Sequence, residues 1–420
     1  MRDFPFRDSK KSDPVTARKI LLVQPQLSSL DGHEHTQISA LDMMLPDDRI
    51  IVLTRIDFAL ADQMTGVEIY PVFPLLAKSG AGDRQNKKPH DSNKESSSSK
   101  PSVPERYLSY VEALSAAVRR FEAGPTDLLI VPSAGPDEIA VLVAFYEQLE
   151  VAQAPRAILR LLSEDVVSGF PASFMERLHT CCRAGRLSLH TETPELRQRL
   201  EEHHGLAIAG QFNLPCTIFA DEVDHAKPPH LSDDDEIKVG VLGRQRAEKG
   251  SYRIAGILKH LRQLALQGNG KQKIRIVYQA VRSKRMRRLM IEFADRLSAG
   301  RNANVTIQYL ESGMSKESFR KLLTDVDILL LPYDTKRYRY SGSGIIMDGV
   351  FALKPIVHSR GMAMQELLSH GNAESATSDR EFAENILKIA SNYDLYKQST
   401  GAAAAYAGQL LDKSAEIFRN

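Results

Sequence analysis

The sequence predicts an α/β protein with two doubly wound domains, each built on a parallel β-sheet. Short apolar runs of strand length alternate with segments of helical spacing along most of the chain. The runs are apolar at consecutive positions, which is typical of strands covered on both faces. A chain of 420 residues is long enough for two cores. A polar stretch with two prolines, near residues 221–236, separates two series of this alternation.

The first domain is expected at residues 18–220, after a polar, flexible N-terminus at residues 1–17. Apolar runs predict strands at 19–23, 49–53, 67–70, 127–132 and 156–162. Helical spacing predicts helices that end near Leu45, span 105–121, run from Asp137 to Tyr146 and begin near Pro194. Thr193 directly precedes Pro194 and is a good N-cap.

A change of composition marks residues 78–104, which contain almost no apolar side chains and include the four serines at 96–99. Such a segment cannot bury enough apolar surface to offset the entropy of ordering its chain. The sequence therefore predicts a disordered surface insertion. Its lysines are expected to be solvated, with contact to an anionic lipid or a partner as the alternative.

The second domain is expected at residues 237–378, with further helices at 379–420. Its predicted strands are 237–242, 274–279, 305–309, 327–331 and 355–358, and its predicted helices are 251–266, 284–298, 316–324, 343–353 and 362–369. The basic run from Arg282 to Arg288 has no interleaved aromatic residues, so it indicates a solvated helix face rather than a nucleic-acid site.

Overall composition limits the possible partners and compartments. The 55 basic and 53 acidic residues give a net charge of +2, so no global field would recruit nucleic acid. The three cysteines form neither a metal-ligand spacing nor a disulfide framework, which favours reduced thiols in a cytoplasm. No apolar run suits a signal peptide or a membrane span. We expect a cytoplasmic protein, with peripheral contact at the inner membrane face left open.

The stretch from Asp327 to Val357 organises the second domain. A buried strand of apolar residues stops at Pro332, and the small residues 341–344 then open a helical pattern that reaches Leu353. Free backbone N–H groups and the helix dipole favour a phosphate at such a helix start. The alternative is an ordinary turn whose glycines serve close packing.

A second segment carries fixed positive charge after a predicted strand. The strand at 237–242 leads into Gly243-Arg244-Gln245-Arg246-Ala247-Glu248-Lys249-Gly250. An arginine can bind a diphosphate through two hydrogen bonds, and a lysine can bind it as a point charge. The alternative is a solvated basic turn.

Together, in this order, the two segments resemble the donor-binding region of GT-B glycosyltransferases of the family 4 type, also called glycosyl transferases group 1. The resemblance covers residues 237–370 well and the N-terminal half by topology, and 187–193 resembles a late strand of the first domain. Members of the family often return their last helix to the first domain. The resemblance implies a donor-binding set of Arg244, Arg246, Lys249, Tyr340, Ser341, Gly342, Ser343, Gly344 and Asp348.

Individual roles follow from the same resemblance. Arg244 and Lys249 would hold the pyrophosphate, with Arg246 as a second candidate. Asp348 stands where the second Glu of the Glu-x7-Glu motif binds ribose. Tyr340 stands where the first Glu contacts the transferred sugar, so this chain departs from the family there.

The expected function is transfer of a sugar from a nucleoside-diphosphate-sugar to an acceptor hydroxyl, in polysaccharide or glycolipid synthesis. The acceptor would be a glycan or a lipid-linked glycan, and no metal cofactor is expected because GT-B enzymes generally need none. The catalytic candidates are His33, Glu34 and Asp137; for the loop at His33 the alternative is an ordinary surface position. Two other functions stay open: a sugar-nucleotide 2-epimerase of the same fold, or a degenerate GT-B protein that binds without catalysis.

Overall fold

The computed structural model describes residues 17–30, 33–74, 105–148, 154–216, 236–267, 272–280, 304–311 and 313–419. Four predicted segments lie outside the described residues, in whole or in part. They are the insertion at 78–104, the helix at 284–298, the linker up to residue 235 and the N-terminal segment 1–17 except for its last residue.

The N-terminal domain is built on a seven-stranded sheet with the order β3-β2-β1-β4-β5-β6-β7, in which every described pairing is parallel. Its strands are β1 (Lys19–Val23), β2 (Arg49–Arg55), β3 (Glu68–Phe73), β4 (Leu128–Ala134), β5 (Arg156–Leu161), β6 (Leu187–Thr191) and β7 (Gly210–Gln211). The strand order reverses between β1 and β4, and in open parallel sheets such a reversal is where ligands bind beyond the strand ends.

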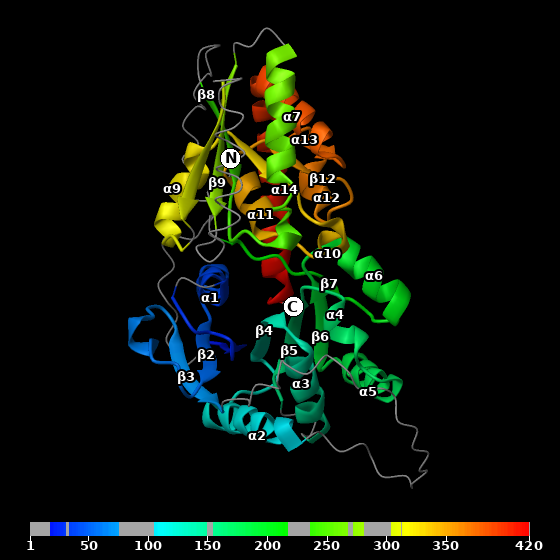
Figure 1. Ribbon diagram of the computed structural model, residues 1–420. Helices are drawn as coiled ribbons and strands as arrows, with labels where there is room; N and C mark the ends of the chain where they lie inside the picture. The colour runs from blue at the N-terminus through cyan, green and yellow to red at the C-terminus, as the bar shows by residue number, and fades with distance from the viewer. Residues whose placement is uncertain are drawn as a thin grey trace, which may run out of the picture.

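Helices cover both faces of this sheet, as Figure 1 shows in its lower half. They are α1 (His33–Met44), α2 (Glu105–Arg120), α3 (Pro136–Gln148), α4 (Asp165–Ser168), α5 (Ala172–Arg183) and α6 (Pro194–His204), with a short 3-10 helix, η1 (Ala61–Gln63). Alternate strand residues point to opposite faces. Leu21 therefore joins the core under α2 and α3, and Leu22 joins the core under α1.

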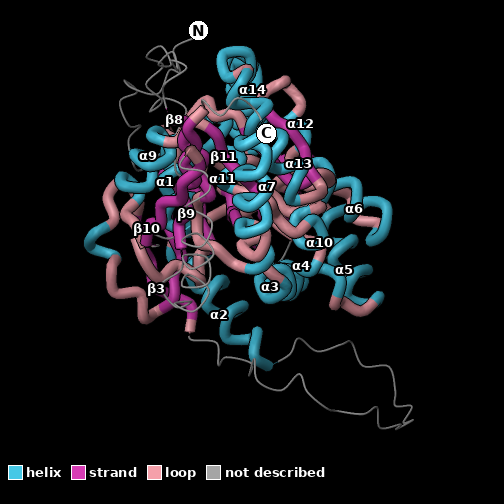
Figure 2. Tube along the Cα trace, turned by 45° about the horizontal axis from the view of Figure 1, so that its top comes forward, coloured by secondary structure: helices cyan, strands magenta, loops and turns pink. Residues whose placement is uncertain are grey.

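The C-terminal domain is built on a six-stranded parallel sheet with the order β10-β9-β8-β11-β12-β13. Its strands are β8 (Glu236–Val241), β9 (Lys273–Ala280), β10 (Val305–Glu311), β11 (Ile328–Leu331), β12 (Ile356–Ser359) and β13 (Ala373–Ala376). Its described helices are η4 (Ala247–Lys249), α7 (Ile254–Gln267), α9 (Lys316–Asp325), α10 (Thr335–Tyr338), α11 (Gly344–Phe351), α12 (Gln365–Leu368), α13 (Asp379–Ser391) and α14 (Tyr393–Ile417). Figure 2 shows the strands lying among these helices.

The last helix connects the two domains. Helix α14 packs against α11 and α12, and its end reaches the N-terminal domain, where C marks the chain end in Figure 1. The Phe418 ring lies 5.2 Å from the Phe212 ring, and the Phe418 carbonyl accepts a hydrogen bond from Arg18. The expected return of the final helix to the first domain is confirmed. No helix among the described residues is long and apolar enough to cross a membrane.

The structure confirms the predicted strands and most predicted helices in the described residues, and it adds short elements that were not predicted. These are α4, α10, β7, β13 and the 3-10 helices η1 and η4; the 12-residue helix α5 was also not predicted. Helix α12 is also shorter than the predicted helix 362–369, because Met364 has a φ of 67° and so cannot continue a right-handed helix.

Candidate functional site

The loop after β8 is tied by hydrogen bonds to β9 and to the segment after β11. The Gly243 N–H donates to Gln279 Oε1 at 2.7 Å, and the Asp334 N–H donates to the Glu248 carbonyl at 2.9 Å. Gly250 has a φ of 69°, and a Cβ added to it would lie 1.8 Å from the Pro332 carbonyl oxygen. Only glycine fits there, so the end of this loop is tied to the end of β11.

Lys249 presents a positive charge inside this loop. Its Nζ lies 5.4 Å from the centre of the Tyr333 ring, a cation–π distance, and the described residues place no carboxylate within ion-pair distance of it. Desolvation lowers the pKa of Lys249, with Arg246 lowering it further and with Tyr338 and Glu248 opposing the change. A desolvated ammonium without a carboxylate partner is unfavourable by itself, so it is suited to receive an anion.

The two arginines of the loop lie in different surroundings from Lys249. Arg244 and Arg246 are both exposed. Arg246 is in addition paired with Glu248 at 3.2 Å. Among the two arginines, Arg246 is the one whose charge acts on Lys249.

Helix α11 begins directly beside this loop. A Cβ added to Gly243 would lie 3.1 Å from Lys249 Nζ and 3.4 Å from Ile345 Cδ1, so the loop and the helix start are in contact. Ser343 is the N-cap residue, and its backbone N–H donates to the Met364 sulfur at 3.1 Å. The structure thus brings the two sequence-predicted segments together, as expected for residues at the carboxyl ends of parallel strands.

Asp348, the predicted ribose ligand, is 2% exposed on α11. Burial raises the pKa of the Cys216 thiol, and the charges of Asp348 and Glu192 raise it further. A Cβ on Gly344 would lie 2.8 Å from Cys216 Sγ, so the segment ending at Cys216 covers the start of α11.

Tyr340, at the position of the missing Glu, faces the N-terminal domain. Its ring lies 5.5 Å from the Arg199 guanidinium and 5.6 Å from that of Arg339, and it packs against the core of the N-terminal sheet. Its carbonyl accepts a hydrogen bond from Thr193 Oγ1 at 2.6 Å. The predicted N-cap role of Thr193 is confirmed by its bond to the Leu196 N–H.

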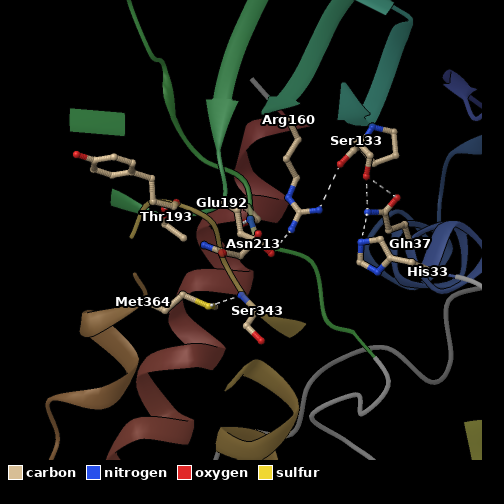
Figure 3. A network of polar contacts seen from close by, with 12 residues as sticks. His33, Gln37, Ser133, Arg160, Glu192, Thr193, Asn213, Ser343 and Met364 are labelled. Carbon is tan, nitrogen blue, oxygen red and sulfur yellow. Dashed lines mark hydrogen bonds and ion pairs between the residues drawn. The ribbon is translucent and has the colours of Figure 1, made fainter. Parts of the chain in front are cut away.

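A buried ion pair of the N-terminal domain lies against the loop that precedes α11. Arg160 on β5 is 1% exposed, and its NH2 group donates to Glu192 Oε1 at 2.7 Å (Figure 3). A Cβ on Gly342 would lie 2.3 Å from Glu192 Oε2. We call Arg160, Glu192 and residues 340–344 the domain junction. Sequence reasoning missed this ion pair, although an arginine inside the apolar strand at 156–161 is an available signal.

His33 begins α1 on the N-terminal side of the junction. The residue is exposed to solvent on one side. The protein atoms around the ring nevertheless lower the pKa of His33 by desolvation, and the charge of Arg160 lowers the pKa further. The charges of Glu192 and Glu34 oppose this change. His33 Nε2 lies 3.0 Å from Gln37 Nε2, and Gln37 also contacts Ser133 (Figure 3). Gln37 and Ser133 were not predicted from the sequence.

Asp137, the third catalytic candidate, belongs to another region. It begins α3, which covers the face of the sheet opposite α1, and its Oδ1 accepts a hydrogen bond from the Tyr107 hydroxyl at 2.5 Å. It lines a pocket with Glu138, Tyr110 and Val23. The structure therefore does not bring Asp137 and His33 together. The described residues also contain no group of three or more His, Cys, Asp or Glu that could hold a metal ion.

Comparison with known proteins identifies the fold. The sequence matches no protein-family model and no curated protein. Among solved structures, a glycosyltransferase from Rickettsia africae is similar with a TM-score of 0.64 and 14% identity, covering 96% of this chain and 98% of that one. A trehalose-6-phosphate protein from E. coli bound with UDP-2-fluoro glucose has a TM-score of 0.64 and 12% identity over 95% and 98% of the two chains.

The HepE protein of Anabaena, in complex with UDP and glucose, is similar with a TM-score of 0.59 and 14% identity, covering 96% of this chain and all (100%) of that one. These similarities cover nearly the whole of each chain and so include both sheets. The protein described here therefore has the two-domain fold of the GT-B glycosyltransferases.

Proposed function

We propose that the protein is a glycosyltransferase that moves a sugar from a nucleoside-diphosphate-sugar to an acceptor hydroxyl. The observation that carries this proposal is the desolvated ammonium of Lys249, without a carboxylate partner among the described residues, beside the start of α11. A diphosphate gains negative charge as the glycosidic bond breaks. Fixed positive charge and helix N–H groups would stabilise that leaving group without reorganisation.

The donor is proposed to be a nucleotide-sugar, and a uridine nucleotide is the first to test. Two structures of the same fold hold UDP-2-fluoro glucose, or UDP and glucose. Asp348 is proposed to bind the ribose once the segment at Cys216 moves. The acceptor is proposed to be a glycan or a lipid-linked glycan, and the reaction is proposed to need no metal cofactor. Both of these points rest on the sequence resemblance.

The first experiment measures nucleotide binding. Thermal unfolding is recorded with UDP, GDP and ADP and with their sugar derivatives. Binding to the native state at a hundredfold excess over Kd stabilises it by about 2.7 kcal/mol, which a melting curve resolves easily. The test variant is Lys249→Ala, in which the stabilisation by the nucleotide should be reduced. The matched control is Lys259→Ala, which should keep the stabilisation because Lys259 is an exposed lysine on α7. Absence of stabilisation by every nucleotide would contradict the donor site.

A second function is favoured by one observation, namely the aromatic ring of Tyr340 where the family has a carboxylate. A protein with this change could bind the nucleotide-sugar without transferring the sugar. Turnover decides between them: release of nucleoside diphosphate that depends on an acceptor indicates transfer, and binding without release indicates a degenerate protein. Interconversion of the donor alone would instead indicate an epimerase.

A further inference from the structure

The amide of Gln37 is oriented by its buried surroundings. Gln37 lies one helical turn after His33 on α1 and is 1% exposed. Its Oε1 accepts a hydrogen bond from Gln24 Nε2 at 3.2 Å. The Ser133 hydroxyl lies 2.8 Å from Gln37 Nε2 and 3.2 Å from Gln37 Oε1, and because it can both accept and donate, the contact with Gln24 is the one that distinguishes the two orientations. Turning the amide over would set its NH2 group against the NH2 group of Gln24, which places two donors face to face. The contacts therefore favour one orientation.

This orientation determines the proton position on His33. Gln37 Nε2 lies 3.0 Å from His33 Nε2, and an amide nitrogen can only donate. The imidazole Nε2 must then accept, so the ring proton of the neutral form sits on Nδ1. No described residue is bonded to Nδ1, and Figure 3 shows the ring at the edge of the network, with its contacts to Gln37.

Charged groups from three elements surround the ring. Arg160 comes from β5, Glu192 follows β6, and Glu34 is the neighbour of His33 on α1. Desolvation and the guanidinium lower the pKa of His33 more than the two carboxylates raise it. A histidine with a lowered pKa is neutral at pH 7.

We propose that His33 is a neutral hydrogen-bond donor through Nδ1 at the domain junction, and that Gln37 is the positioning residue that sets its tautomer. The proton acceptor of His33 is already occupied, so the residue does not act as a general base on the acceptor hydroxyl. The Nδ1–H group would donate to an oxygen atom of the bound substrate. This last step rests on the proposed glycosyltransferase function, whereas the tautomer does not.

The test is nuclear magnetic resonance of the full chain with 15N-labelled histidine, with the His33 signals assigned from their loss in His33→Asn. At pH 7.5 we expect Nδ1 to carry the proton and Nε2 to be unprotonated. In Gln37→Glu a carboxylate replaces the donor, so the proton should move to Nε2 and the pKa of His33 should rise. An Nε2–H tautomer or an imidazolium in the wild type, or a Gln37→Glu spectrum identical to the wild type, would overturn the proposal.

Activity gives an independent measurement once a donor is known. The amide nitrogen of asparagine takes the place of Nδ1, and that of glutamine takes the place of Nε2. Both variants alter the proposed site and should lower kcat/KM, but His33→Gln should lose about ten- to hundredfold more than His33→Asn, the effect of one lost hydrogen bond to a charged or developing oxygen. Equal, large losses in both variants would indicate a base and refute the donor role. Failure to find any sugar transfer would refute the proposed function and leave the tautomer result standing.

Discussion

Replacing Lys249 by methionine should change activity and stability in opposite directions. Methionine keeps the length and most of the apolar contacts of the side chain, including those with Tyr333, but removes the ammonium. Without a donor bound, that ammonium is desolvated and has no carboxylate partner among the described residues. Its loss should therefore stabilise the free protein while it removes a contact that the leaving diphosphate needs.

The magnitudes follow from these surroundings. Loss of one preorganised electrostatic contact typically lowers turnover by about 10²–10³-fold, so kcat/KM should fall by roughly that factor. Removing a destabilised functional-site charge commonly raises the free energy of unfolding by about 0.5–2 kcal/mol. Because the pKa of Lys249 is lowered in the folded protein, the ammonium destabilises the folded state at every pH below its folded pKa, and this cost disappears as pH rises from the folded to the unfolded pKa. The variant should gain most at neutral pH and less at alkaline pH.

Steady-state kinetics with the donor found by thermal shift measure the first effect, and urea unfolding at pH 7 and pH 10 measures the second. Lys259→Met on the exposed face of α7 is the control, and it should change neither quantity appreciably. Turnover of Lys249→Met close to that of the wild type would refute the assignment of the diphosphate to this loop. A lower stability at pH 7 would refute the claim that the ammonium is held at a cost.

Three further predictions concern stability. Gly250→Ala should lose about 2–4 kcal/mol of unfolding free energy in urea, because the added Cβ meets the Pro332 carbonyl at a positive φ. Gly401→Ala should instead gain about 0.5–1 kcal/mol, because Gly401 has open space around it in helix α14. Arg160→Met should cost about 1–3 kcal/mol by leaving the half-buried Glu192 without its partner, and adding Glu192→Gln should recover part of the loss in a double-mutant cycle; strict additivity would contradict the pairing. Desolvation, aided by the charge of Lys397, lowers the pKa of Lys354 to about 8. The difference in unfolding free energy between Lys354→Met and the wild type should therefore favour the variant more at pH 7 than at pH 10, by up to about 3 kcal/mol. The same difference at both pH values would contradict this prediction.

The fold class and the strand, loop and helix of the two segments proposed to bind the donor could be predicted from local sequence. The apolar run Ile328–Leu331 is a strand because every residue in it can be buried, and the small residues after it open a helix. The contact between the loop after β8 and the start of α11 also follows, since parallel strands that neighbour each other end at one edge. Short elements such as β7 and α4 were missed because two to four residues cannot display a period.

Tertiary structure alone decided which side chains meet. Asp137 and His33 both follow strand ends in the sequence, yet their helices cover opposite faces of the sheet, which depends on how each connection crosses it. The partner of Arg160 lies 32 residues away, directly after the next strand, and no local pattern identifies it. The proton position proposed for His33 depends on an amide that meets Gln24, after β1, and Ser133, on β4. Local sequence therefore determined which elements form, because backbone preference and burial are local properties, and packing between elements decided the charges and protons of the site.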